Sequence, residues 1–312
     1  MAALGRPGYI NIGHNKDIGP DKSVESMQKN AWQVLDAAWD SGVRYFDVAR
    51  SYGLAEEFLA GWIAACNIDR KDITVASKWG YRYTADWKIS SDAHEVKDHS
   101  AAHFRKQMVE SKQILGIQLD LYQIHSATLE SGVLDDHEVL DQLAKKKKDG
   151  LSIGLSLSGI YQEETLRKAI TIKRDGLSLF TAVQATWNVL NQSTTEILNE
   201  ASDSGMKIII KESLANGRLT SRNRAANFAD KKELLDKLAD SKQSSIDAIA
   251  IAFALKQPWA DVVLSGAANV DQLKANMSAR NILFASNENK LLQEIQEDPN
   301  KYWETRNQLV WN

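Results

Sequence analysis

The sequence predicts an α/β protein built as a (β/α)8 barrel, also called a TIM barrel. Short runs rich in β-branched residues alternate with longer segments whose apolar residues recur every three or four positions. This alternation indicates a parallel sheet, because each crossover between parallel strands needs a helix on the face of the sheet. The competing open sheet that binds dinucleotides normally carries G-x-G-x-x-G after its first strand. Neither that pattern nor the phosphate loop G-x-x-x-x-G-K-[ST] occurs.

Seven predicted strands follow one another along the chain: Tyr45–Asp47, Ile73–Lys78, Leu119–His125, Ile153–Ser158, Phe180–Trp187, Lys207–Glu212 and Val262–Ser265. Helical patterns between them include Ala31–Trp39, Phe58–Ile63 and Val139–Ala144. Eight units close a barrel of typical size, so an eighth strand is expected near the N-terminus. Tyr9–Gly13 is the candidate for this first strand, and the alternative is a first strand that is shortened or partly missing. No linker rich in Pro, Gly or Ser divides residues 1–312, which predicts a single domain.

The composition excludes several classes of partner. Lysine and arginine number 38 against 41 aspartates and glutamates, so the net charge is −3. Such a balance predicts no binding to nucleic acid or to an anionic membrane. The only basic run, Lys145–Lys148, is interpreted as the solvated last turn of a helix. Cys66 is the only cysteine, and the longest apolar run, Ala248–Leu255, is too short to cross a bilayer. We therefore expect a cytoplasmic protein.

Four ionisable residues fall at the carboxyl ends of three consecutive predicted strands, where a parallel barrel builds its active site. Asp47 ends one strand, and Tyr52 follows five residues later. Lys78 ends the next strand, and His125 ends the one after it. Each residue alone is explained more simply by helix capping, a rim charge or packing. Together they predict a catalytic site. Holding complementary ionisable groups in one place costs free energy, and such clusters are typical of functional sites.

The purpose that these groups suggest is proton transfer to a carbonyl oxygen. A phenol with a pKa of about 10 is a weak acid near neutral pH. A neighbouring ammonium favours the phenolate, and a carboxylate can orient that ammonium. We therefore expect Lys78, held by Asp47, to lower the pKa of Tyr52. His125 is expected to donate to the substrate oxygen or to relay the proton, while a reduced nicotinamide supplies hydride to the carbonyl carbon.

The stretch Phe46–Gly53, with the sequence FDVARSYG, resembles the F-D-T-A-x-x-Y-G motif of the aldo-keto reductases. Lys78 in a strand and His125 within L-Y-Q-I-H extend this resemblance, which covers nearly the whole chain. The resemblance implies a barrel that binds its nicotinamide cofactor extended across the mouth, without a Rossmann fold. It also implies that Tyr52 is the general acid in reduction and the general base in oxidation. Lys78 and Asp47 would then adjust its acidity, and His125 would position the carbonyl.

The same resemblance implies cofactor-binding residues further along the chain. Ser156 matches the serine of the family's G-V-S-N, and Gln184 matches the glutamine that holds the nicotinamide amide. Leu157 replaces the asparagine of that motif, which leaves one carboxamide contact unassigned. Lys211 stands where an aromatic residue often stacks on the nicotinamide ring, so it would place a cation near the ring or the phosphates. The segment that follows is similar to the family's Y-S-P-L-x-x-G-x-L-T and adds the cofactor residues Glu212, Ser213, Leu214 and Asn216.

Residues 266–276 are similar to the family's loop and helix for the adenosine phosphate, where backbone amides at a helix start meet an anion. The residues implied here are Gly266, Ala268, Gln272 and Asn276. The family often has an arginine at the position of Gln272 to grip the 2′-phosphate, and a glutamine cannot form that charged pair. The resemblance implies NADP, the usual cofactor of the family, with Lys274 or Arg280 supplying the cation that pairs with the 2′-phosphate. NAD stays open as the alternative.

The long segment after the third strand is expected to carry substrate specificity, as long loops on this face usually do. Aromatic residues with a few polar groups predict a pocket for a small carbonyl or alcohol. The predicted pocket residues are Trp79, Tyr81, His99 and, from a later strand, Trp187. No metal site is expected, because no cluster of thiolates or carboxylates accompanies the histidines of this segment. The C-terminal tail, with Trp303 and Trp311, is expected to fold over the mouth or to form a dimer contact.

Taken together, the residues and the resemblance predict an NAD(P)-dependent oxidoreductase that interconverts an aldehyde, ketone or sugar carbonyl and its alcohol. A cofactor-binding regulatory subunit of the same barrel family, with little turnover, is the alternative from another class. A barrel that has lost its function through a short N-terminus is a third hypothesis. Neither the physiological substrate nor the oligomeric state follows from the sequence.

Overall fold

The computed structural model describes residues 1–312 and confirms the predicted fold class, with seven strands of an α/β barrel in one parallel sheet. Each of the seven predicted strands is present, to within two residues at either end. The order across the sheet is β1-β2-β5-β6-β9-β10-β11. The bounds are β1 (Tyr45–Asp47), β2 (Thr74–Trp79), β5 (Leu119–Ala127), β6 (Ser152–Leu157), β9 (Ala182–Thr186), β10 (Lys207–Lys211) and β11 (Val262–Val263).

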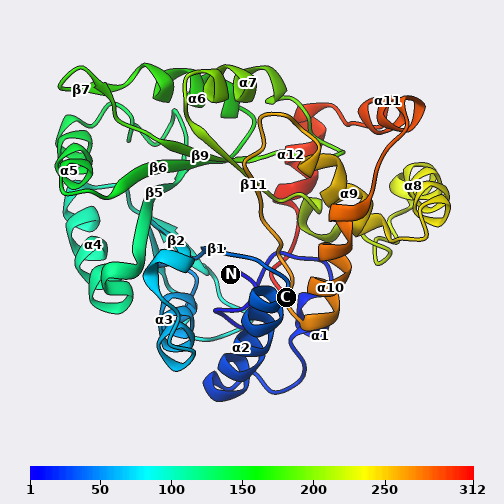
Figure 1. Ribbon diagram of the computed structural model, residues 1–312, viewed down its shortest axis with the longest axis horizontal. Helices are drawn as coiled ribbons and strands as arrows, with labels where there is room; N and C mark the ends of the chain where they lie inside the picture. The colour runs from blue at the N-terminus through cyan, green and yellow to red at the C-terminus, as the bar shows by residue number, and fades with distance from the viewer.

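Helices lie around the outside of this sheet, as Figure 1 shows for α4, α5, α6 and α7 beside β5, β6 and β9. Two short hairpins stand apart from it, β3 (Tyr81–Tyr83) with β4 (Glu95–Lys97) and β7 (Lys173–Arg174) with β8 (Leu177–Ser178). The helices are α1 (His14–Asp17), α2 (Val24–Asp40), α3 (Ala55–Ala65), α4 (Ala101–Leu115), α5 (His137–Lys148), α6 (Gln162–Thr171), α7 (Thr195–Asp203), α8 (Ala229–Ser241), α9 (Ile246–Leu255), α10 (Val270–Ser278), α11 (Ser286–Glu294) and α12 (Pro299–Asn307).

Local sequence explains where several helices begin and end. The Ser23 side chain caps α2 by accepting from the Ser26 amide, and Asp136 caps α5 in the same way. Such caps satisfy backbone N–H groups that have no partner inside the helix. Lys145–Lys148 form the last turn of α5, as predicted, where cations interact favourably with the unpaired carbonyls. None of the helices combines the length and the apolar character that a membrane span requires.

The core lies between the sheet and its helices. A single cluster of 75 buried apolar residues joins side chains from β1 to α12. The centre of β10 is the run Ile208–Ile210, buried on both faces, which is typical of a parallel strand covered by helices. Helix α9 is apolar all round, and its residues Ala248–Ala254 are all buried, which explains the long apolar run in the sequence.

The sheet is open between its two edge strands, β1 and β11, which do not pair with each other. The prediction that Tyr9–Gly13 forms the first strand is wrong, because none of these residues lies in a strand and Ile10–Gly13 form bends and turns. Tyr9 instead exchanges two backbone hydrogen bonds with Asn312, both of 3.1 Å. The amino group of Met1 lies beside the free edge of β1, where it donates to the Asp47 carbonyl oxygen (2.5 Å). Helices α2 and α10 pack together on the outside of this opening (Figure 1).

Candidate active site

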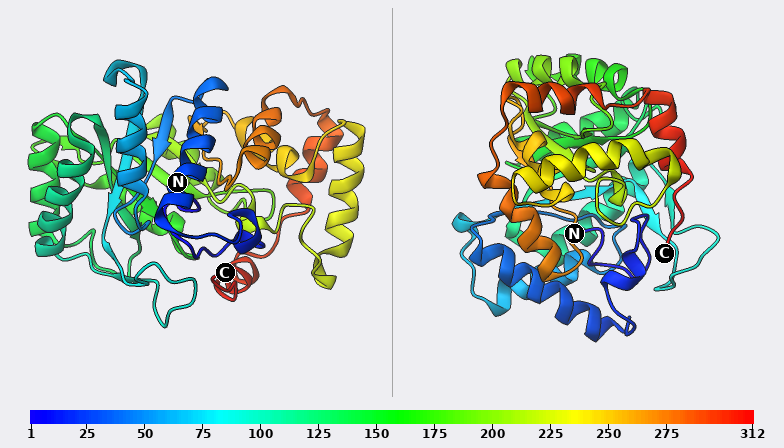
Figure 2. Two further views of the ribbon diagram at one scale, coloured as in Figure 1. Left: turned by 90° about the horizontal axis from the view of Figure 1, so that it is seen from below. Right: turned by 90° about the vertical axis from the view of Figure 1, so that its right-hand side faces the viewer.

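A cavity with a volume of about 600 Å³ includes the carboxyl ends of the strands. This volume is within the usual range for a ligand site, about 300–1,000 Å³. The N-terminal segment and the C-terminal tail complete its wall, and the two lie side by side in the views of Figure 2. Asp47, Tyr52 and His125 all line this cavity, so the strand ends meet as the sequence predicts.

Lys78 and Asp47 form a buried ion pair on adjacent strands. The register pairs Asp47 of β1 with Ala76 of β2, which brings Lys78 alongside. Lys78 Nζ donates to Asp47 Oδ1 and to the Val48 carbonyl oxygen (3.0 Å), and its side chain is only 1% exposed. Two amides also donate to the other carboxylate oxygen, Gln184 Nε2 at 2.9 Å and Gln123 Nε2 at 3.2 Å. The Asp47 carboxylate is therefore held from several sides and in turn fixes the ammonium.

Tyr52 stands next to this pair on the loop that follows β1. Its ring centre lies 5.2 Å from Lys78 Nζ, and its hydroxyl is 3.4 Å from His125 Nε2. The other ring nitrogen of His125 is 3.3 Å from Ser51 Oγ, which holds the imidazole in place. The loop requires Gly53, because its φ is +62° and a Cβ there would lie 2.3 Å from the Gly5 carbonyl oxygen. The four ionisable side chains are thus assembled into one contact network.

Burial sets the protonation states of the phenol and the imidazole. It raises the pKa of Tyr52 well above its usual range; Asp47 adds to this rise, and Arg6 opposes it. The predicted lowering of the Tyr52 pKa is therefore wrong for this structure, because the effect of burial is the largest and the ammonium of Lys78 does not offset it. Burial and the nearby cation of Lys78 lower the pKa of His125 well below its usual range. At neutral pH the phenol is protonated and the imidazole is uncharged.

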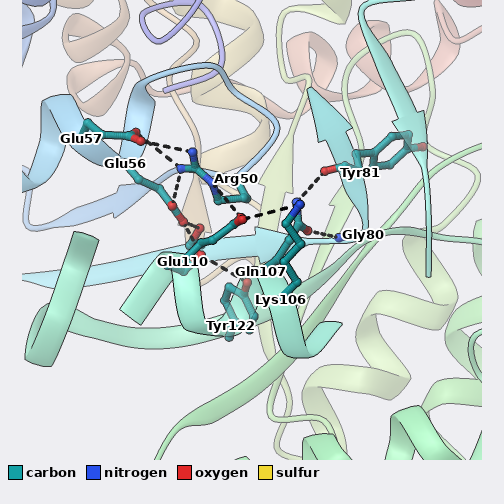
Figure 3. Close-up of polar contacts among 11 residues, drawn as sticks. Arg50, Glu56, Glu57, Gly80, Tyr81, Lys106, Gln107, Glu110 and Tyr122 are labelled. Carbon is teal, nitrogen blue, oxygen red and sulfur yellow. Dashed lines mark hydrogen bonds and ion pairs between the residues drawn. The ribbon is translucent and has the colours of Figure 1, made fainter. Parts of the chain in front are cut away.

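A second network, drawn in Figure 3, fixes the loop that carries Tyr52. Arg50 donates through Nη1 to Glu56 Oε2 (2.8 Å), and its backbone amide donates to the Lys78 carbonyl oxygen (3.0 Å). The fully buried Glu56 also accepts from two hydroxyls, those of Ser77 at 2.5 Å and Ser111 at 2.7 Å. The Glu56 carboxylate therefore links the loop to strand β2 and helix α4. This explains why Tyr52 sits on an ordered loop.

Gly80 and Gln107, also in Figure 3, direct the chain from β2 into the hairpin β3–β4. The φ of Gly80 is +114°, and a Cβ at this position would lie 2.4 Å from the ring of His99. Gln107 accepts from the Gly80 amide (2.9 Å) and donates to the Tyr81 carbonyl oxygen (2.8 Å). This turn places Tyr81 in the cavity wall, where the sequence predicts it.

The other three predicted pocket residues do not line the cavity. Trp79 is 0% exposed and packs on Phe104 of α4, with ring centres 4.9 Å apart. The reason is the alternation of side chains along a strand: Lys78 faces the barrel interior, so Trp79 faces the helices. His99 lies behind the wall and donates to the His125 carbonyl oxygen (2.9 Å). Trp187 is buried in the core, stacked on Phe253.

Most of the residues implied for the cofactor line the cavity: Ser156, Gln184, Lys211, Glu212, Ser213, Leu214, Asn216, Gly266 and Asn276. The buried side-chain oxygens of Asn216 and Asn276 have no hydrogen-bond partner in the protein. Buried polar atoms normally have partners, so these two oxygens fit a ligand that donates to them. A Cβ built on Gly266 meets no atom within 4 Å, which leaves its backbone open to approach. The residues therefore fit an extended polar ligand such as a nicotinamide dinucleotide.

Ala268 and Gln272 lie outside the cavity wall, contrary to the cofactor assignment. Gln272 accepts from the Ala268 amide (2.9 Å), so its side chain is hydrogen-bonded to the backbone of its own loop. Asn269 caps α10 by accepting from the Gln272 amide (3.0 Å). Of the two cations considered for the phosphate, Arg280 lines the cavity and Lys274 does not. Arg280 donates to the Ser41 carbonyl oxygen (2.8 Å) and has no carboxylate partner.

Lys211 and Glu212 form a partly buried charged group at the end of β10. Lys211 Nζ donates to Thr186 Oγ1 (2.6 Å) and lies 3.8 Å from Glu212 Oε1. Burial lowers the pKa of Lys211 to about 8. The pKa of Glu212 falls to about 2, because Lys211 and Arg306 outweigh the opposing effect of burial. Glu212 also has a positive φ of 55°, as do its cavity neighbours Ser126 at 52° and Asn216 at 55°. Such backbone conformations cluster at functional sites.

Two charged residues of the cavity wall, Arg6 and Glu95, were not predicted from the sequence. Arg6 from the N-terminal segment and Glu95 from β4 form an ion pair of 2.8 Å in the wall. Trp311 from the C-terminal tail stacks on His94, and its ring centre is 4.6 Å from the Arg6 guanidinium carbon. The tail therefore contributes to the cavity wall, which agrees with the first of the two roles expected for it. No spacing signal marks Arg6 or Glu95, because each contact joins segments distant in sequence.

Comparisons with known proteins bear on this site. The model of the Aldo/keto reductase family matches residues 18–297. An aldo-keto reductase of Gibberella moniliformis is 25% identical, covering 93% of this chain and 89% of its own length. A D-threo-aldose 1-dehydrogenase of a Pseudomonas species is 23% identical, with 79% and 82% covered. The holo form of an aldo-keto reductase from Bacillus halodurans superposes with a TM-score of 0.68 over 90% of each chain, at 21% identity, and supports the fold.

Proposed function

This chain belongs to the aldo/keto reductase family, and we propose that it is a nicotinamide-dependent oxidoreductase that interconverts a carbonyl and its alcohol. The observation that carries the proposal is the contact between the Tyr52 hydroxyl and His125 Nε2 (3.4 Å) beside the buried Lys78–Asp47 pair. The substrates are aldehydes, ketones or sugars. The Pseudomonas relative is named for an aldose, which keeps sugars among the candidates.

In the reductive direction, Tyr52 gives its proton to the carbonyl oxygen. The raised pKa of Tyr52 keeps the phenol protonated until it acts. As the proton leaves, negative charge grows on the phenol oxygen, and the Lys78 ammonium 5.2 Å from the ring centre stabilises it. The neutral imidazole of His125 orients the carbonyl through a hydrogen bond. When bound, the reduced nicotinamide supplies the hydride that the carbonyl carbon receives. In oxidation, Tyr52 takes the proton back.

We propose NADP as the cofactor. Arg280 supports this choice, because it lines the cavity just after the end of α10 and has no carboxylate partner. A guanidinium can pair with a phosphate through two hydrogen bonds. Asn216 and Asn276, with their unpartnered oxygens, and Ser156 and Gln184 would hold the polar edges of the cofactor.

Lys211 should make cofactor affinity depend on pH and on redox state. Its ammonium, present below a pKa of about 8, would repel the positive oxidised nicotinamide ring. At about 6 Å and an effective dielectric of about 20, the repulsion from the ammonium alone is about 3 kcal/mol. The Glu212 carboxylate, 3.8 Å from the ammonium, offsets part of it. We expect NADPH to bind at least about tenfold more tightly than NADP⁺ at pH 6.5. The ratio should shrink above pH 8 and lose its pH dependence in Lys211→Met. Isothermal titration of both forms measures it.

Lys207→Met is the matched control, because Lys207 begins the same strand and is 72% exposed. That variant should keep the pH dependence of the wild type. A Lys211→Met protein whose two affinities match those of the wild type at each pH would show that Lys211 does not face the ring.

The proposed function is tested by steady-state assays of aldehydes, ketones and sugars, in both directions and with both cofactors. We expect many turnovers per enzyme with at least one carbonyl. We also expect kcat/KM to be at least about tenfold higher with NADPH than with NADH, since one charged phosphate contact contributes about 1.5–3 kcal/mol. Oxidation of bound cofactor that stops after one turnover would favour a regulatory subunit instead. A preference for NADH would contradict the choice of NADP.

A further inference from the structure

Ser51 contacts the nitrogen of the His125 ring that does not contact Tyr52, and the proposed proton transfer does not use it. Ser51 is 1% exposed, and its hydroxyl oxygen lies 3.3 Å from His125 Nδ1. This nitrogen is the only hydrogen-bond partner of the hydroxyl. The backbone of Ser51 is fixed as well, because its carbonyl oxygen accepts from Nη1 of the buried Arg6 (3.0 Å). The hydroxyl is therefore held within reach of the imidazole.

The surroundings of the ring decide which of its two nitrogens carries the hydrogen. Burial and the cation of Lys78 lower the pKa of His125, so the imidazole is neutral, with one N–H donor and one acceptor nitrogen. A hydrogen on Nδ1 would point at the Ser51 oxygen and leave the Ser51 hydroxyl hydrogen buried without an acceptor. A hydrogen on Nε2 leaves Nδ1 free to accept from that hydroxyl. Because a buried donor without a partner is unfavourable, the second tautomer is favoured.

The tautomer determines what Nε2 of His125 offers to the reaction. This nitrogen lies 3.4 Å from the Tyr52 hydroxyl oxygen. With its own hydrogen, Nε2 is a donor to the carbonyl oxygen and cannot accept the proton of Tyr52. Without that hydrogen, its lone pair would accept from the Tyr52 hydroxyl and would repel the carbonyl oxygen. Only the Nε2–H tautomer therefore leaves the phenol proton for the substrate and adds a second donor to the same oxygen.

We propose that Ser51 is a positioning residue, whose hydroxyl donates to His125 Nδ1 and keeps the imidazole in the tautomer that carries its hydrogen on Nε2. Ser51 does not line the cavity, so it acts through His125 and not by contact with a substrate. Other contacts place the ring: His99 Nε2 donates to the His125 carbonyl oxygen (2.9 Å), and the Tyr81 ring packs on the imidazole. Loss of the Ser51 hydroxyl should therefore change the tautomer without displacing the ring. The inference rests on the proposed function, since it assumes that His125 orients a carbonyl for Tyr52.

Long-range ¹⁵N–¹H correlation NMR of the NADPH-bound protein, labelled at histidine, measures the tautomer, because protonated and unprotonated ring nitrogens have distinct shifts. The spectrum of His125→Asn identifies the signals of this ring among the six histidines. We expect the hydrogen on Nε2 in the wild type and in Ser51→Thr, which keeps the hydroxyl. In Ser51→Ala the share of the Nδ1–H tautomer should rise at least about tenfold, and kcat should fall at least about tenfold, with NADPH affinity unchanged.

Thr165→Val is the matched control, because it also removes one buried hydroxyl. Thr165 lies on α6 outside the cavity, is 0% exposed and donates to the Tyr161 carbonyl oxygen (2.7 Å). This variant should keep the His125 signals and the kcat of the wild type. An effect that follows from the loss of any buried hydroxyl would appear in both variants.

The outcomes separate this inference from the function on which it rests. An active wild type whose His125 carries its hydrogen on Nδ1, or a Ser51→Ala protein that keeps either the wild-type tautomer or the wild-type kcat, would overturn the role of Ser51 while carbonyl reduction stands. If Ser51→Ala does not fold, as judged by NADPH binding, the wild type and Ser51→Thr decide, since both must carry the hydrogen on Nε2. A wild type that binds NADPH but turns over neither glyceraldehyde nor benzaldehyde would overturn the proposed function, whichever tautomer it shows.

Discussion

Replacing Tyr52 by phenylalanine should lower kcat by about 10²–10⁴-fold, the usual contribution of a positioned general acid. The change removes only the hydroxyl, whose one partner is His125 Nε2 at 3.4 Å. The packing of the ring against Arg6 and Lys78 remains, so the fold and the cofactor affinity should be nearly unchanged. Single-turnover reduction of an aldehyde, with NADPH binding followed by fluorescence, measures both quantities in the same sample.

Tyr81→Phe is the matched control, because Tyr81 is another phenol of the same cavity wall. Its ring packs on that of His125, with centres 4.9 Å apart. Its hydroxyl is assigned no proton transfer, so kcat should stay within about tenfold of the wild type, below the range of a general acid. If Tyr52→Phe retained turnover comparable to that of Tyr81→Phe, the proton would have to come from another group, and the proposed mechanism would be lost.

Lys78→Met should abolish turnover and also destabilise the protein. The substitution leaves the Asp47 carboxylate buried with only the amides of Gln123 and Gln184 as partners. Removing one partner of a buried ion pair typically costs about 3–5 kcal/mol, because the other charge stays out of water without compensation. We expect the free energy of unfolding, measured by urea denaturation with the slope unchanged, to fall by this amount.

The double variant Asp47→Asn with Lys78→Met separates stability from chemistry. The asparagine removes the uncompensated charge, so the double variant should recover at least half of the stability lost by Lys78→Met alone. Turnover should not return, because no ammonium remains to stabilise charge on the Tyr52 oxygen. A double variant that regained activity together with stability would show that Lys78 serves the fold and not the reaction.

The sequence predicted the strands because each is a short β-branched run between helical patterns. The ends of such strands also located the proposed catalytic group: once the sheet is parallel, Asp47, Lys78 and His125 must meet at one edge. The same logic applied more strictly would have placed Trp79 correctly, since a residue next to an inward-facing lysine on a strand faces outward. The direction of the Tyr52 pKa shift could not be predicted, because burial raises this pKa and has a larger effect than the neighbouring charges that the sequence reveals.

The positions of Arg6 and Glu95 in the cavity wall could not be predicted from the sequence for a different reason. Arg6 meets Glu95 across 89 positions of the chain, and neither side chain belongs to a periodic pattern. Gln272 lies outside the cavity wall, because its side chain at the start of α10 bonds the backbone of its own loop. Local patterns fix strands and helices, whereas the loops between them adopt whichever long-range contacts their polar side chains can satisfy.

The pairing of Tyr9 with Asn312 spans 303 positions, so it closes a loop of nearly the whole chain. Closing so large a loop is entropically costly and must await the association of everything between. The strand ends that carry the acid arise from neighbouring β–α units, which can assemble earlier. We therefore expect the part of the cavity wall that the two ends of the chain form to be completed later in folding than the strand ends.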